Sequence, residues 1–97
     1  MIISKRMMTI MADKIGVKCQ GQEHLEIEIE VTTPYHSYFV DFEFTDKVAY
    51  QEIETGAWIG AIDLTIHSVK VFDNDATGLE VENLQEVLNT LTEKNSY

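Results

Sequence analysis

Residues Leu25 to Val31, with the sequence LEIEIEV, alternate strictly between apolar and acidic side chains. Successive side chains of a strand point to opposite faces, so this alternation predicts a β-strand with one buried and one solvated face. A helix would instead need apolar residues three and four positions apart. The solvated face of the predicted strand carries Glu26, Glu28 and Glu30. A fold for this chain must therefore offer a core to one side of the strand and tolerate a row of like charges on the other.

Two later stretches carry the same kind of signal. Tyr38–Thr45 alternates with aromatic residues and valine on one parity, which predicts a second strand. Its other parity holds Phe39, Asp41 and Glu43. Ile62–Phe72 is a long strand candidate whose apolar parity changes at His67-Ser68, and this change predicts a β-bulge. Asp46-Lys47, between the two stretches, is typical of a turn.

The residues before Leu25 suggest a hairpin partner for the first strand. Ile15–Gln20 also alternates, and Gly21 in the following Gln-Gly-Gln turn can adopt a positive φ. A three-residue loop would place Val17 opposite Leu25 and would set Lys14 opposite Glu28. That pairing would partly neutralise the row of glutamates.

We expect residues 1–13 to be a flexible or late-docking N-terminal segment and residues 14–97 to form a single small domain. The alternative for 1–13 is a short helix. Its apolar stripe would consist of Ile3, Met7, Ile10 and Met11.

The period of the pattern changes near the end of the chain. Apolar residues there recur at helical spacing, at Val81, Leu84, Leu88 and Leu91. Asn83 followed by Glu86 suggests a capping box at the start of this helix. The predicted fold class is thus α+β, with an antiparallel meander of four to five strands and one C-terminal helix packed on it.

Charge narrows the choice of partners. The 97 residues have a formal net charge of −10, and four of the seven basic residues lie within residues 1–18. Direct nucleic-acid binding and binding to an anionic membrane surface both need clustered Lys and Arg, so both are disfavoured. Solubility, attraction to a basic protein and imitation of nucleic acid remain. Cys19 is the only cysteine, which excludes an internal disulfide and fits a reducing compartment.

No motif for catalysis, a cofactor or a metal stands out. Asp73–Gly78 is similar to the first half of a calcium loop, but position 12 of that loop would be Leu84 instead of a bidentate Glu. The spacing of Cys19 and the histidines (His24, His36 and His67) matches no zinc pattern. We find no nucleophile beside a base and no Gly-rich phosphate loop. We therefore expect a non-enzymatic protein without a cofactor or metal.

The remaining candidates are acidic and aromatic residues that suit a protein interface. We define the acidic patch as Glu26, Glu28, Glu30, Asp41 and Glu43. Tyr and Trp dominate binding hot spots, which adds Tyr35 and Trp58, although Trp58 between two glycines also fits a core position. Phe39 shares the parity of the acids, so either the helix covers it in part or it contacts a partner or a second copy. The patch exists as one surface only if the strands of Glu28 and Asp41 are neighbours.

The last third of the chain, from IDLTIHSVKVFDND through LQEVLNTLTEK, resembles a recurrent type of small tailed-phage and prophage protein. Such proteins are acidic and rich in strands, and they close with a strand, an acidic turn and a short Leu-rich helix. The matching residues are Ile66, Val69, Val71, Asp73, Asp75, Leu84, Leu88 and Leu91. The chain lacks the Pro/Gly-rich middle of that type. By composition it also resembles phage anti-defence inhibitors.

These observations lead to two functional expectations. The first is a phage or prophage accessory protein in the cytoplasm of a bacterial host, which binds another, possibly basic, protein as an inhibitor or nucleic-acid mimic. The second is a structural or assembly component that self-associates, for example as a homodimer, through a sheet edge or Phe39. Neither needs direct contact with nucleic acid or membrane.

Overall fold

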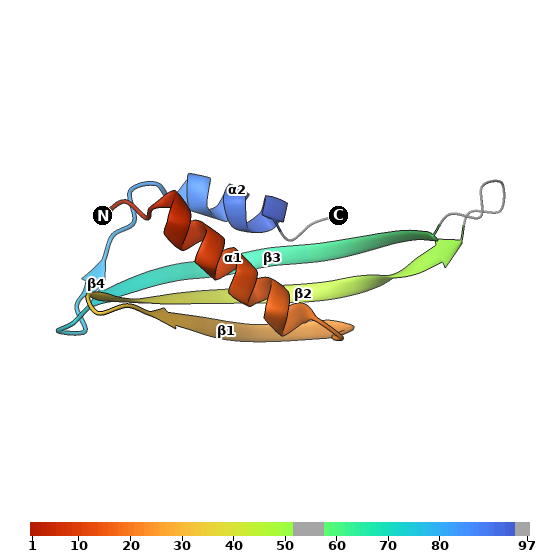
Figure 1. Cartoon of the computed structure of the whole chain (residues 1–97), viewed down its shortest axis with the longest axis horizontal. Helices are drawn as coiled ribbons and strands as arrows, with labels where there is room; N and C mark the ends of the chain where they lie inside the picture. The colour runs from red at the N-terminus through yellow and green to blue at the C-terminus, as the bar shows by residue number, and fades with distance from the viewer. Residues whose placement is uncertain (52–57, 95–97) are drawn as a thin grey trace.

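One antiparallel sheet with two helices makes up the fold (Figure 1). The computed structural model describes the backbone of residues 1–51 and 58–94 and the side chains of residues 1–46 and 63–93. The elements are α1 (Lys5–Cys19), β1 (His24–Thr32), β2 (His36–Gln51), β3 (Trp58–Asp73), β4 (Gly78–Leu79) and α2 (Leu84–Lys94). The strands form a four-stranded meander in the order β1-β2-β3-β4. The expected α+β class and antiparallel meander are confirmed, and α1 is an additional helix.

The core lies on one face of the sheet, as the alternating pattern predicts. Ile29, Val40 and Val69 form one row across β1, β2 and β3 on that face. Phe42, near the middle of β2, is fully buried. Both helices pack on this covered face, and they contact each other as well as the sheet. The opposite face, which we call the open face, has no helix over it in the described part of the chain (Figure 1).

The largest difference from the predicted fold concerns residues 5–19, which form α1 instead of a segment followed by a strand. Ser4 caps the helix by accepting a hydrogen bond from the Met7 amide. Its buried face consists of Met8, Met11, Ala12 and Ile15. Val17, which the predicted hairpin directed into the core, is 67% exposed. The predicted strand over Ile15–Gln20 is therefore wrong, and the helical alternative for the N-terminal residues extends further than expected.

The turn at Gly21 is real but connects different elements. Gly21 has a φ of 73°, as predicted, and links α1 to β1 instead of closing a hairpin. The strand partner of β1 is β2, with Leu25 opposite Phe44. Asp46 is not in a turn as expected, because β2 continues through it to Gln51. This continuation makes β2 and β3 sixteen residues each and gives the molecule a length of 57 Å.

The start of the chain is attached to the segment before α2. The Asn83 side chain accepts a hydrogen bond from the Ile3 amide and donates one to the Ile3 carbonyl, both at 2.9 Å. The Asn83 carboxamide oxygen therefore bonds to Ile3, where the predicted capping box would direct it to the amide of Glu86. Within α2 the fully buried residues are Val87 and Leu91, whereas Leu84 is 40% exposed. The apolar stripe of α2 is thus rotated relative to the predicted one.

The loop after β3 is held by Asp73. One carboxylate oxygen of Asp73 accepts hydrogen bonds from the amides of Asp75 and Thr77, both at 2.9 Å. The positive φ in this loop belongs to Ala76, at 60°. The loop therefore has the self-bonded geometry of an Asx turn.

Substitutions at two positions of α1 test its packing. We expect Ile15→Ala to lower the free energy of unfolding by about 2–5 kcal/mol, because the side chain is fully buried. Val17→Ala in the same helix should change it by less than about 0.5 kcal/mol, because Val17 is mostly exposed. Urea unfolding of both variants gives the comparison. Equal losses would point to the hairpin and contradict the helix.

Candidate functional site

The open face brings the acidic patch together. In the β1–β2 ladder Glu26 lies directly opposite Glu43, Glu28 opposite Asp41, and Glu30 opposite Phe39. Residues that are direct partners in a ladder share a face, so all five acids of the patch point away from the helices. The three glutamates of β1 are exposed, and Asp41 and Glu43 are half-buried. The adjacency on which the patch depends is therefore present.

Two of these cross-strand pairs join like charges. Directly opposite residues have Cβ atoms about 4.5–5.5 Å apart, and like charges at that distance destabilise a sheet. The Glu26–Glu43 and Glu28–Asp41 pairs thus work against folding. Local conflicts of this kind concentrate at functional sites, where another requirement outweighs stability.

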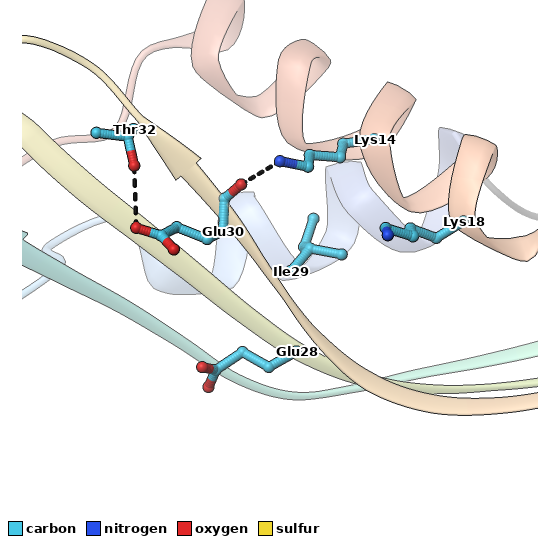
Figure 2. A pocket seen from close by; sticks show the side chains of 6 residues that line it. All are labelled: Lys14, Lys18, Glu28, Ile29, Glu30 and Thr32. Atoms are coloured by element: carbon cyan, nitrogen blue, oxygen red, sulfur yellow. Dashed lines mark hydrogen bonds between the residues drawn. The ribbon is translucent and has the colours of Figure 1, made fainter.

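The base that was expected opposite Glu28, Lys14, lies on a helix and not on a strand. Lys14 and Lys18 belong to α1, and together with Glu28 and Glu30 they line a hollow of about 430 Å³ beside β1 (Figure 2). The Lys14 ammonium donates a hydrogen bond to the main-chain carbonyl of Glu30, not to a carboxylate. The predicted pairing of Lys14 with Glu28 is therefore wrong, since it depended on the hairpin.

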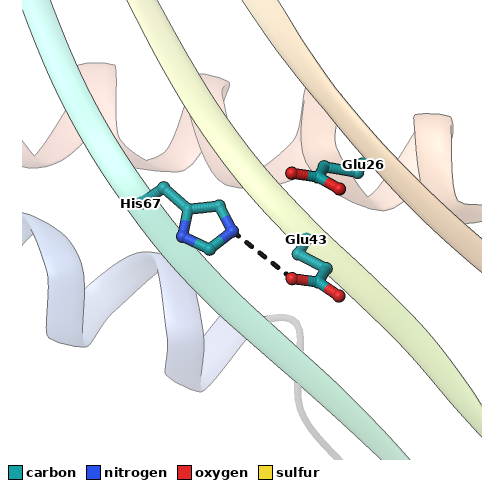
Figure 3. A group of neighbouring side chains, drawn as sticks. All are labelled: Glu26, Glu43 and His67. Carbon is teal, nitrogen blue, oxygen red and sulfur yellow. Dashed lines mark ion pairs between the residues drawn. The ribbon is translucent and has the colours of Figure 1, made fainter.

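Histidine supplies the ion pair that the patch forms within the described residues. His67 Nε2 lies 3.5 Å from Glu43 Oε2 (Figure 3). His67 is the extra residue of a bulge, because Ile66 pairs with Phe42 whereas Ser68 pairs with Asp41. The bulge predicted at His67-Ser68 is confirmed, and both His67 and Ser68 lie on the open face. A carboxylate oxygen of Glu26 completes a group whose ligand atoms all lie within 4.8 Å of one another.

Phe39 is neither covered by a helix nor fully exposed. Its ring packs edge-to-face against Phe72 on the open face, with the ring centroids 5.5 Å apart. The two rings line a hollow of about 470 Å³, together with Thr32, Thr33, Ser37, Asp73, Asn74 and Ala76. Lys70 is the ladder partner of Phe39 on β3 and is exposed. We call Phe39 and Phe72 the aromatic end of the open face, and it adjoins the acidic patch. The parity of Phe39 indicated that its side chain shares a face with the acids, but the sequence did not predict its contact with Phe72.

Of the two other aromatic candidates, Tyr35 and Trp58, only Tyr35 has a described side chain. Tyr35 is 72% exposed in the turn between β1 and β2. The side chain of Trp58 lies outside the described residues, so neither its core nor its interface interpretation is tested.

Burial shifts two titrating groups. It raises the pKa of the Cys19 thiol and the pKa of the Tyr38 hydroxyl. A thiol with a raised pKa holds less of the nucleophilic thiolate at neutral pH. Cys19 therefore lacks the activation that a catalytic cysteine needs.

Comparison with protein-family models, with curated proteins and with solved structures found no match to this chain. Among the described residues, neither helix is long and apolar enough to cross a membrane.

The like-charge pairs predict a gain in stability on charge reversal. Glu28→Lys replaces a repulsive pair with Asp41 by an attractive one, so we expect the free energy of unfolding to rise by about 0.5–1 kcal/mol at low ionic strength. High salt should shrink the gain. Glu23→Lys is the control, because it makes the same change in net charge in the exposed connection between α1 and β1. An equal gain in both variants, measured by urea unfolding, would show general repulsion and not the cross-strand pair.

Proposed function

We propose that this chain is a non-enzymatic accessory protein of phage or prophage origin, which acts in the bacterial cytoplasm by binding a basic protein through the acidic patch. The observation that carries the proposal is the two cross-strand pairs of like charge, Glu26–Glu43 and Glu28–Asp41, on the open face of the sheet. A solvated sheet face needs polar residues, but it does not need five acids gathered on two adjacent strands.

The charge density of the patch supports a partner that binds anions. The three glutamates of β1 span about 14 Å at the usual rise of a strand. With the two acids of β2, this gives one negative charge per about 2.8 Å. Duplex DNA carries one per about 1.7 Å, so the patch is sparser but of the same order. A protein surface that binds nucleic-acid phosphates would meet a comparable electric field at the acidic patch. By occupying that surface, the chain would block it sterically or electrostatically.

A capture experiment with two matched variants tests this proposal. Immobilised wild-type chain in lysate of a bacterial host should retain a basic protein at low salt and release it as salt rises, because exposed charges are screened beyond about 8–10 Å. The double variant Glu28→Gln/Asp41→Asn should lose this protein. The control Glu23→Gln/Glu80→Gln should keep it, since it removes two exposed charges away from the patch.

Two results would overturn the proposal. One is equal capture by both variants, which would place the contact elsewhere. The other is the absence of any basic protein that wild type retains and the patch variant does not.

A self-associating structural component is the second candidate function, and the aromatic end favours it. Phe39 and Phe72 form a half-buried apolar pair beside an open hollow. β1 lies at one edge of the sheet, where unpaired backbone groups can pair with another chain. Both features fit contact with a second copy.

Light scattering over a range of concentrations distinguishes this candidate. An apolar contact should persist at high salt, and Phe39→Ser should shift the population toward monomer because it removes the ring that packs on Phe72. A wild-type chain that stays monomeric throughout would eliminate this function. Thermal unfolding of the variant checks that the fold is intact.

A further inference from the structure

The open face carries a donor set that differs chemically from the rest of the acidic patch. Glu26, Glu43 and His67 each come from a different strand, β1, β2 and β3, and their side chains converge (Figure 3). An imidazole nitrogen with carboxylate oxygens is a set that zinc accepts, whereas calcium and magnesium prefer oxygen alone. We propose that these three residues bind a divalent cation of the zinc class.

The distances fit such an ion with small side-chain movements. A tetrahedral zinc ion holds nitrogen and oxygen ligands at about 2.0–2.2 Å, which places the ligands roughly 3.4 Å from one another. His67 Nε2 and Glu43 Oε2 are already 3.5 Å apart. All the donor atoms lie within 4.8 Å, so Glu26 needs a shift of about one ångström or a little more to close the set. Three protein ligands leave a fourth position for water or for an atom of a partner.

The backbone holds the donors in place. Glu26 and Glu43 are direct partners in the β1–β2 ladder, and His67 lies on the same face of β3, two residues after Thr65, the ladder partner of Glu43. Ligands on adjacent strands of one sheet are more precisely placed than ligands on loops. The bulge follows at once, because Ser68 pairs with Asp41 and therefore also lies on the open face.

The electrostatics also favour a cation at this point. The Glu26–Glu43 pair has no lysine or arginine in ion-pair contact within the described residues, and His67 Nε2 lies 3.5 Å from Glu43 Oε2. A bound divalent ion would replace a repulsive pair with two attractive contacts. This inference does not rest on the proposed function, since it concerns zinc binding by the isolated chain.

Titration calorimetry with zinc chloride and the full chain tests the site. We expect one saturable site in wild type, and a loss of affinity of at least about tenfold in His67→Gln and in Glu43→Gln. The matched controls are His24→Gln and Glu28→Gln, which remove a second imidazole and a second exposed carboxylate from the same face. Both should keep the wild-type affinity. An excess of magnesium should leave zinc binding in place, because the imidazole donor does not suit magnesium.

A second readout uses the wild-type chain alone and is independent of how any variant folds. In the ¹H–¹⁵N spectrum of the imidazoles, zinc should shift the ring nitrogens of His67 and leave those of His24 and His36 in place. The proposal is overturned if zinc does not saturate, or if Glu28→Gln weakens binding as much as His67→Gln, which would indicate a diffuse counterion. It is also overturned if the shifts occur at His24 or His36. The variants of the capture experiment, Glu28→Gln/Asp41→Asn and Glu23→Gln/Glu80→Gln, leave all three donors intact. Failure of the zinc proposal therefore does not imply failure of the proposed partner binding, and the reverse also holds.

Discussion

Burial of a single face of the sheet is the constraint on which the rest of this structure depends. The alternation in β1 and in residues 36–46 of β2 directs the large apolar side chains, with the exception of Phe39, to one side, where α1 and α2 cover them. Phe42, Ile15 and Leu91 meet there, from the sheet and from both helices, with no accessible surface. A small domain has little apolar surface to spare, so both helices go to the same face. The open face is the direct result, and neither α1 nor α2 covers the charges on it.

The strands could be predicted because their signal is local. Alternation and aromatic content identify β1 and the first part of β2, and the parity change at His67 identifies the bulge. Helix α1 could not be predicted with the same ease, since Ile15, Val17 and Cys19 alternate like a strand and Gly16 and Val17 are weak helix formers. Tertiary packing overrides this local preference. The spacing of Met8, Met11 and Ile15, with Ser4 as a cap, was the signal that could have identified the helix.

The candidate site shows the same division between local and long-range information. The sequence places the acids on the solvated parity of each strand, but only the register of β1 against β2 sets Glu28 opposite Asp41. Register depends on which strands are neighbours. Because residues 15–19 form part of α1 and not a strand, the neighbour of β1 is β2 and not the predicted hairpin strand. The convergence of His67 with Glu43 depends on the register of β2 against β3, so no spacing along the chain could have indicated it. The Phe39–Phe72 contact is likewise a product of the β2–β3 ladder.

The separation of the two faces also gives the molecule an electric polarity. On the covered side of the sheet, α1 carries four exposed bases (Lys5, Arg6, Lys14 and Lys18) against one acid, Asp13, and α2 adds Glu86 and Glu93, while the acidic patch occupies the other side. A molecule charged in this way has a dipole moment across its thin dimension in addition to its net negative charge. In the field of a basic surface it would turn before contact, with the open face leading and α1 trailing. Orientation during approach raises the rate of productive encounter, so the position of α1 would bear on the association kinetics of a contact made through the open face.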